Sequence, residues 1–480
     1  MEAGLRDRLQ RKGAAPKVGI VHLGPGAFFR AFVAVFTEDA MAARGGDWGI
    51  LAVSLRSPTA RDQLGPQGGT FTAVELGPDG ESPRVIGAVA RVLVAPEDPG
   101  AVVAAMADPA VRIVSLTVTE KGYCHNPATG QLTLDHPDIA HDLAHPDAPT
   151  SAPGFVVAGL ARRRAEGTPP FTVLSCDNLP SNGALVRGMV LAFARARDPD
   201  LAQWIADTVR FPATMVDRIT PATTPADVDR LAATLGYRDP GLVVHEPFGQ
   251  WVIEDDFPQG RPDWDAGGAQ FVASVEAHET MKLRCLNGTH STLAYLGYLA
   301  GHETIAEAGA DPPFAALCER LWAAEILPTI AQPEGENLPD YCAALLARYR
   351  NPAIRHRTWQ IAMDGSQKLP QRLLGTIRDN LASGRVPAGL CLAVAGWMRY
   401  VGGVDEAGRP IDVRDPLADR LRAASDGADT PEGKVAALLA VDAVFDAALA
   451  GDAQFRDAVT VAYRRLVADG ARRAVEGYLA

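Results

Sequence analysis

In the first half of the chain, short apolar runs rich in β-branched residues alternate with segments in which apolar residues recur at helical spacing. The runs are bounded by turn-forming residues and occupy 17–23, 48–55, 111–119 and 171–176. Apolar positions three and four residues apart predict helices between them, as at 99–107 and 184–197. Strands and helices that alternate in this way predict a parallel sheet and an α/β fold for this half.

After about residue 275 the pattern becomes almost entirely helical. Ala/Leu-rich helical segments, with almost no strand signal between them, occupy 281–301, 312–332, 339–350, 371–384, 388–400, 433–450 and 453–478. The Pro/Gly/Asp-rich piece 257–268 predicts the junction, and the Ala/Asp/Gly-rich piece 422–433 predicts a surface loop. We therefore expect an α/β domain over residues 1–270 and an all-helical domain over 271–480.

The composition is typical of a soluble globular protein with an acidic surface. The 480 residues are 47% hydrophobic and 22% charged, and the formal net charge is −12. A negative surface repels nucleic acids and anionic membranes, so we expect neither as a partner. The N-terminus lacks the apolar segment of a secretory signal, and no run of about 18 uninterrupted apolar residues occurs. We expect a soluble, cytoplasmic protein.

The six cysteines are scattered along the chain, and none forms a CxxC pair. This usage predicts reduced thiols rather than a disulfide framework. Together with the ten histidines, they form no cluster at a recognisable zinc-ligand spacing. We therefore expect no metal.

A glycine-containing turn, Gly24-Pro25-Gly26, follows the first predicted strand. In a dinucleotide-binding unit, the first glycine makes the tight turn, and the second lets the backbone approach a pyrophosphate. Phe29 stands at the usual place of the third glycine, so an ordinary turn is the alternative. The second strand ends in Ser-Leu-Arg56-Ser without an acidic residue for the ribose of NAD. Arg56 could hold the 2′-phosphate of NADP or could be a solvated arginine, so both cofactors stay open.

Lys282, Asn287 and His290 stand where a helix is predicted to begin, just after Glu279 and Thr280. At about 100° per residue, their positions fall within a fan of roughly 140°, so an amine, an amide and an imidazole could converge. A lysine among apolar neighbours can lose its proton near neutral pH and act as a base. The alternative is a partly buried polar helix face with no chemical role.

Four landmarks together resemble the polyol-specific long-chain dehydrogenases, the mannitol dehydrogenase family. They are the GxGxFxR turn at 24–30, the Ser-Cys-Asp-Asn run at 175–178, the VDRIxP pattern within 211–221, and the set Lys282, Asn287 and His290. The resemblance extends from about residue 15 to near the C-terminus. One departure is that Phe29 and Phe32 stand where the family usually carries histidines. This departure leaves details of the cofactor pocket and of the substrate open.

Longer stretches resemble one branch of that family, the fructuronate reductases (D-mannonate oxidoreductases). The stretches are 115–124, 250–255, 356–371 and 394–400. This resemblance implies NAD-dependent interconversion of D-mannonate and D-fructuronate. A neutral polyol such as mannitol or arabinitol is the alternative substrate. A non-catalytic sugar-acid or dinucleotide-binding protein of the same fold is a more distant alternative. The resemblance also implies a monomer or a weak homo-oligomer.

The resemblance implies a metal-independent alcohol dehydrogenase in which Lys282 is the general acid/base. Asn178 and Asn287 would donate hydrogen bonds to the developing alkoxide, and His290 would orient a substrate hydroxyl. Glu279 would relay the proton to water. The alternatives are an Asx-turn for Asn178, a satisfied core histidine for His290 and an acid that favours the helix N-terminus for Glu279.

Further residues match family positions near the substrate and the cofactor. Asp217 and Lys368 lie near the substrate by this resemblance, and Lys368 would suit a carboxylate. Arg357 is a weaker carboxylate candidate, with a surface role as its alternative. Glu120 and Lys121 would belong to an ordered loop beside the cofactor. The implied cofactor-binding residues are Gly24, Gly26, Ala27, Phe28, Arg30 and Arg56.

Overall fold

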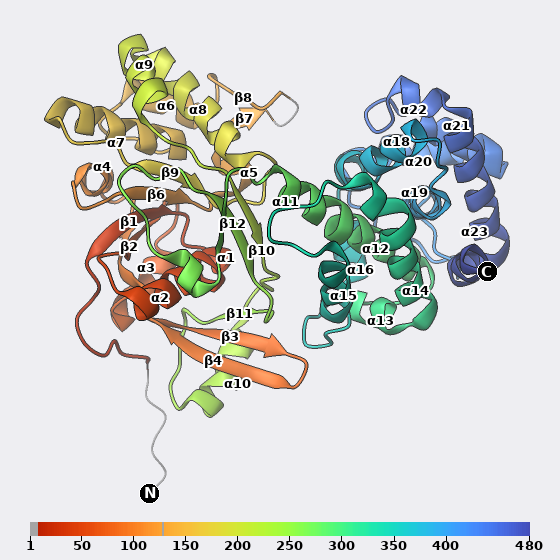
Figure 1. Cartoon of the computed structure of the whole chain (residues 1–480), viewed down its shortest axis with the longest axis horizontal. Coiled ribbons are helices and arrows are strands. Elements are labelled where there is room, and N and C mark those ends of the chain that lie inside the picture. The colour runs from red at the N-terminus through yellow and green to blue at the C-terminus, as the bar shows by residue number, and fades with distance from the viewer. Residues whose placement is uncertain (1–7, 127–128) are drawn as a thin grey trace, which may run out of the picture. The chain divides into compact units, whose positions relative to one another are not determined.

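The structure is a computed structural model that describes residues 8–126 and 129–480 (Figure 1). The chain divides into two units, Met1–Glu276 and Ala277–Ala480. The first unit contains a parallel sheet with helices, and the second is mainly helical. Both halves of the predicted fold class are therefore confirmed.

The main sheet of the first unit has five parallel strands in the order β5-β2-β1-β6-β9. Its strands are β1 (Val18–Leu23), β2 (Gly49–Ser54), β5 (Val89–Val94), β6 (Ile113–Leu116) and β9 (Thr172–Ser175). The strand order reverses at β1, which is the order of dinucleotide-binding sheets. Four of these strands coincide with the predicted apolar runs. The fifth, β5, was missed because Arg91 is exposed and interrupts its apolar run.

Alternate residues of each strand enter different cores, because successive strand side chains point to opposite faces. Val21 and Leu23 of β1 pack with the helices on one face, whereas Ile20 enters an aromatic-rich core on the other. The helices of the first face are α4 (Pro99–Ala107), α6 (Pro137–Ala144), α7 (Ala152–Glu166), α8 (Asn182–Arg197) and α9 (Pro199–Thr208). The second face carries α1 (Ala27–Ala31), α2 (Val33–Arg44) and α3 (Thr59–Leu64).

Smaller sheets complete the first unit, and the sequence patterns did not predict them. They are β11-β3-β4, formed by β3 (Phe71–Gly77), β4 (Gly80–Ile86) and β11 (Val243–His245); β10-β12-β13, formed by β10 (Thr214–Asp217), β12 (Gln250–Glu254) and β13 (Gln270–Val272); and β7-β8, formed by β7 (His125–Asn126) and β8 (Gln131–Leu132). Several of these strands are short, and β4 is almost wholly exposed and contains Pro83, so no apolar alternation marks them. The remaining helices of this unit are α5 (Thr119–Gly122), η1 (Gly65–Gln67), α10 (Pro225–Leu235) and η2 (Trp264–Gly267).

The second unit packs helices around α19 (Ala388–Val401), which is almost wholly buried against α12 and α23. Its other helices are α11 (Glu276–Met281), α12 (Thr289–Leu299), α13 (Ile305–Ala310), α14 (Pro312–Arg320), η5 (Leu327–Thr329), α15 (Leu338–Tyr349), α16 (Thr358–Ala362), α17 (Gly365–Leu369), α18 (Gly375–Ala382), α20 (Ala418–Asp426), α21 (Pro431–Leu439), α22 (Ala447–Gly451) and α23 (Ala453–Leu479). Three π-helical turns interrupt the α-helices: η3 (Lys282–Gly288), η4 (Leu321–Ile326) and η6 (Pro370–Leu374).

Three local predictions in the second unit were wrong. The helix carrying Lys282 begins at Glu276, before the predicted start, and the Glu276 N–H donates a hydrogen bond to Ser274 Oγ. The predicted loop 422–433 is largely helical, since α20 runs to Asp426 and Thr430 caps α21. The predicted helix 433–450 is broken between α21 and α22.

Among the described residues, no helix combines the length and the apolar character that crossing a membrane requires. All six cysteines are buried and unpaired.

Candidate functional site

A cleft of about 360 Å³ opens at the carboxyl ends of β1, β2 and β6. The cleft is lined by Gly24, Pro25 and Gly26 after β1, by residues 54–57 at the end of β2, and by Thr117 and Val118 after β6. It lies where the strand order reverses, which is where open α/β sheets bind their ligands. Position and lining therefore fit a dinucleotide.

The two glycines of the turn meet different surroundings. Gly24 has φ +92°, and a Cβ there would stand 2.3 Å from the Thr117 carbonyl oxygen. A Cβ on Gly26 would meet no atom within 4 Å, and this residue is exposed at the start of α1. Gly24 therefore makes the turn, and Gly26 leaves open backbone that a pyrophosphate can approach.

We expect Gly24→Ala to lower stability and Gly26→Ala to weaken NADH binding. Gly24→Ala should lower the free energy of unfolding by at least about 1–3 kcal/mol, because it forces a strained backbone against a fixed carbonyl. Gly26→Ala should keep the wild-type Tm but weaken NADH binding at least about tenfold, or 1.4 kcal/mol. Thermal unfolding and fluorescence titration with NADH measure the two effects. A Gly26→Ala variant that binds NADH normally would contradict the assignment of this turn.

The phenylalanines that depart from the family pattern pack away from the cleft. Phe29 is buried and stacks on His22 at 3.9 Å between ring centroids. Phe32 is buried against Phe28 and Trp251. Neither residue lines the cleft, so the departure changes the core rather than the cofactor surface.

Some of the predicted cofactor-binding residues line the cleft and others do not. Arg30 lines the cleft, and its Nη1 donates to the Gly241 carbonyl oxygen at 2.7 Å. Burial lowers the pKa of Arg30 to about 10, so it remains charged. Ala27 and Phe28 pack against the aromatic-rich core and do not line the cleft. Their role in cofactor binding stays a prediction.

His22, which the sequence reasoning did not single out, ties β1 to β6. Its ring nitrogens lie 2.8 Å from Ser115 Oγ and 2.9 Å from Thr117 Oγ1. Burial lowers the pKa of His22 to about 3, so the ring is neutral. Its two hydrogen bonds hold the end of β1, just before the glycine turn, against β6. A histidine inside an apolar strand just before a glycine turn was the available signal.

Asp177 belongs to the Ser-Cys-Asp-Asn run at 175–178, whose pattern predicts no role for it, and it anchors the loop after β6. It accepts hydrogen bonds from the backbone of Val118 and Thr119 at 3.1 and 2.8 Å and from the Tyr123 hydroxyl at 2.7 Å. Burial raises the pKa of Asp177, although these donors oppose the shift. The loop that borders the cleft is thereby fixed to the end of β9.

Arg56 lines the cleft and forms an ion pair with Asp138 at the start of α6. The hydrogen bond to Asp138 raises the pKa of Arg56 and lowers that of Asp138. The guanidinium at the end of β2 is therefore neutralised by a neighbouring carboxylate.

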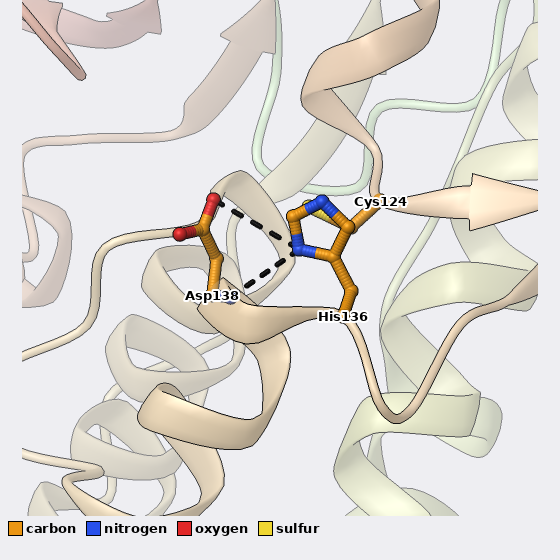
Figure 2. Close-up of side chains that lie close together, drawn as sticks. All are labelled: Cys124, His136 and Asp138. Atoms are coloured by element: carbon orange, nitrogen blue, oxygen red, sulfur yellow. Dashed lines mark hydrogen bonds and ion pairs between the residues drawn. The ribbon is translucent and has the colours of Figure 1, made fainter.

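Cys124, His136 and Asp138 lie close together, although their spacing in the sequence did not suggest a site (Figure 2). Their possible ligand atoms are all within 4.8 Å of one another, and His136 Nδ1 lies 4.0 Å from Asp138. Each group already has a protein role: His136 Nδ1 accepts the Asp138 backbone N–H, and Asp138 holds Arg56. Burial raises the pKa of the Cys124 thiol to about 11, so it is protonated. These contacts describe a helix cap and an ion pair, and the absence of a metal stays a prediction.

In the second unit, Lys282 and Asn287 are carried by the π-helical turn η3, and His290 follows in α12. Lys282 and His290 are buried, each 7% exposed, and Asn287 is half-buried. Because a π-helix closes its turns between residues five apart, Lys282 and Asn287 lie one turn apart on the same face. The α-helical spacing assumed for them was wrong, but the actual turn aligns these two residues better.

His290 lies in a cationic polar cluster formed with His356, Lys368 and Arg372. The His290 and His356 rings are 5.1 Å apart, and Arg372 Nη1 donates to Ser291 Oγ at 3.1 Å. Burial, and then the charges of its neighbours, lower the pKa of His290, and burial lowers that of His356 to about 4. Both rings are therefore neutral. Among the described residues, His290 Nε2 and His356 Nδ1 have no hydrogen-bond partner, although both atoms are buried.

The other predicted site residues occupy different positions. Asn178 is exposed just beyond β9, Asp217 is buried at the end of β10, and Glu279 is half-buried in α11. Lys368 Nζ donates to the Met363 carbonyl oxygen at 2.6 Å within the His290 cluster. The Arg357 side chain is 58% exposed and lies 3.7 Å from Glu303, so it is not part of that cluster.

Comparisons with known proteins agree with this architecture. A model of the mannitol dehydrogenase Rossmann domain matches residues 18–266, and a model of the mannitol dehydrogenase C-terminal domain matches residues 274–467. The D-mannonate oxidoreductase of Escherichia coli (strain K12) is 49% identical over 95% of this chain and 94% of its own length. The mannitol 2-dehydrogenase of Aspergillus terreus (strain NIH 2624 / FGSC A1156) is 40% identical over 98% of this chain and 94% of its own length.

A solved structure extends the similarity to three dimensions. Pseudomonas fluorescens mannitol 2-dehydrogenase, in a ternary complex with NAD and D-mannitol, is 39% identical. The match covers 99% of this chain and 97% of that chain, with a TM-score of 0.83. The predicted resemblance is confirmed: the chain belongs to the mannitol dehydrogenase family and is a dehydrogenase that acts on CH–OH groups.

Proposed function

We propose that the chain interconverts D-mannonate and D-fructuronate with NAD, using Lys282 as the general acid/base. The observation that carries this proposal is a buried lysine on a π-helical turn, one turn from Asn287 and close in the chain to the cationic cluster around His290. An amine so placed suits proton transfer, and the surplus of positive charge suits an acidic substrate. The identity to the Escherichia coli D-mannonate oxidoreductase supports the same substrate.

A bound nicotinamide cofactor would supply the hydride acceptor in oxidation and the hydride donor in reduction. In oxidation, the Lys282 amine takes the proton of the substrate hydroxyl, and in reduction the protonated amine donates to the ketone oxygen. Asn178 and Asn287 donate hydrogen bonds to this oxygen while it carries charge. His290 binds a neighbouring hydroxyl, Asp217 contributes to substrate binding, and Glu279 relays the proton to water.

The test is NADH oxidation with D-fructuronate beside D-fructose, repeated with NADPH. We expect fast turnover of fructuronate with NADH and little with fructose. Preference for fructose would make the chain a polyol dehydrogenase and overturn the substrate assignment. No NADH-linked turnover of either ketose, or of a polyol in the reverse direction, would overturn the proposed chemistry.

NAD is proposed over NADP because Asp138 neutralises the arginine that would hold a 2′-phosphate. We expect Asp138→Ala to raise the ratio of kcat/KM with NADPH to that with NADH about tenfold, since a charge-assisted hydrogen bond contributes about 1.5–3 kcal/mol, and less at an exposed site. Steady-state kinetics with both cofactors measure the ratio. The control is Asp135→Ala, which removes an exposed carboxylate nearby in the chain. An unchanged ratio in Asp138→Ala would show that this ion pair does not set cofactor preference.

The lowered pKa of Lys368 leads us to expect that substrate binding depends on pH. Burial and then the Arg372 charge lower the pKa of Lys368 to about 8, while Asp364 and Asp415 oppose the shift. The amine is charged below that pH and neutral above it, so attraction for a carboxylate is present at pH 7 and lost as the pH rises. The other titratable groups that interact with it are His290 and His356, which stay neutral throughout this range.

We expect the Kd of D-mannonate to rise by up to about tenfold per pH unit above pH 8. Calorimetry in a Lys282→Ala background excludes titration of the general base. Adding Lys368→Met should flatten the profile, whereas Lys434→Met should leave it unchanged. A flat profile with Lys368 present would contradict its role as a carboxylate partner.

A further inference from the structure

Arg372 is a partly buried arginine for which the described residues provide no counter-ion. The structure provides no carboxylate partner for it among the described residues, and the only groups that raise its pKa against burial are the hydroxyls of Tyr295 and Tyr349. Among the described residues, its guanidinium donates one hydrogen bond, from Nη1 to the neutral Ser291 Oγ. A guanidinium has five N–H groups, so most of its donors have no protein acceptor here.

Arg163, a buried arginine with a structural role, provides a comparison for the hydrogen bonding of Arg372. Its guanidinium donates to four backbone carbonyls: those of Met106, Asp108, Val111 and Pro169. Buried charge is costly unless it is hydrogen-bonded, and these four acceptors meet that requirement. Arg372 has no such set. The difference indicates that its acceptors come from outside the chain.

The position of Arg372 links it to the catalytic turn. It lies on η6, which packs against η3, and its carbonyl oxygen would be 2.9 Å from a Cβ on Gly288 at the end of η3. Its guanidinium bonds to the residue after His290. Its charge also lowers the pKa of both His290 and Lys368, so the three groups are close neighbours.

The same cluster contains two further buried ring nitrogens that could bind a ligand. His290 Nε2 and His356 Nδ1 are buried without partners in the described structure, and both imidazoles are neutral. A neutral imidazole can donate or accept a hydrogen bond to a hydroxyl, whereas a guanidinium pairs with a carboxylate through two parallel bonds. Together the groups match a polyhydroxy acid, with its carboxylate at Arg372 and its hydroxyls at the histidines.

We propose that Arg372 recognises the substrate carboxylate and sets the preference for sugar acids over neutral sugars. This inference rests on the proposed function and names the residue that carries its specificity. Lys368 is the weaker partner, because two backbone carbonyls already accept from its amine. Arg357, the arginine that the sequence suggested, is exposed beside Glu303.

The experiment compares kcat/KM for D-fructuronate and D-fructose, both with NADH, in wild type, Arg372→Leu and Arg372→Lys. For Arg372→Leu we expect a loss of about 10- to 100-fold on fructuronate, mainly in KM, and no loss on fructose. Arg372→Lys should recover part of the loss, since it keeps the charge but not the paired bonds. Arg378→Leu, at an exposed arginine paired with Asp446, is the matched control and should change neither substrate.

Each other outcome overturns the inference. Equal loss on both ketoses would show a structural role, and an unchanged preference for fructuronate would remove Arg372 from carboxylate recognition while leaving the proposed function intact. Wild type that does not use fructuronate would overturn the proposed function and this inference together. We expect Arg372→Leu to fold normally and Tm not to fall, because it removes a partly buried charge that forms no ion pair among the described residues. A large fall in Tm in both Arg372→Leu and Arg372→Lys would support a structural role instead.

Discussion

Lys282→Ala is expected to abolish turnover, with kcat about 10²- to 10⁴-fold lower, while NADH affinity stays within a few-fold of wild type. The reason is that the proton of the reacting hydroxyl loses its acceptor, whereas the cofactor cleft is lined by residues of the first unit alone. Stopped-flow measurement of the hydride-transfer step and fluorescence titration with NADH separate the two effects.

Two companion variants make this result interpretable. Lys282 is buried, so Lys282→Met keeps most of the side-chain volume and tests the amine without leaving a cavity. Lys434→Ala makes the same substitution at a partly exposed lysine of the second unit, whose amine bonds to the Ser425 carbonyl, and should retain full kcat. Near-wild-type activity in Lys282→Ala or Lys282→Met would eliminate Lys282 as the general acid/base.

The parts of the fold that were predictable are those whose strands are buried on both sides. β1, β2, β6 and β9 are buried along almost their whole length and rich in apolar residues, because helices or other strands cover both faces of the sheet. The edge strand β5 and the small outer sheets carry exposed polar residues, so the same pattern did not mark them. Periodicity reports burial, and it fails where an element is only partly buried.

The candidate site was predictable as a set of residue types but not as a geometry. The glycine turn and the group Lys282, Asn287 and His290 were recognisable from spacing and resemblance. The π-helical turn was not, because one changed hydrogen-bond register leaves no mark in a hydrophobic pattern. Arg372 was missed for a different reason: in a Gln-Lys-Leu-Pro-Gln-Arg run, it resembles a solvated helix residue until its neighbours are known.

Asn287→Ala is expected to lower kcat about 10²- to 10³-fold with little change in KM. Removing an amide donor to the charged oxygen costs about 2.7–4 kcal/mol of transition-state stabilisation in comparable sites, but the uncharged ground state uses it less. Asn287→Asp should be at least as poor, because a carboxylate repels the developing alkoxide. Steady-state kinetics with saturating NADH measure both variants.

The control for Asn287 separates catalysis from stability. Asn337 caps α15 by accepting the Asp340 backbone N–H, so Asn337→Ala should cost about 1 kcal/mol of unfolding free energy and leave kcat unchanged. Asn287→Ala should show the reverse, a low kcat at nearly wild-type Tm, because its side chain is half-buried on the face it shares with Lys282. If kcat in Asn287→Ala fell only as far as Tm fell, the amide would be a packing residue. The charged oxygen would then depend on other donors, with Asn178 the next to replace.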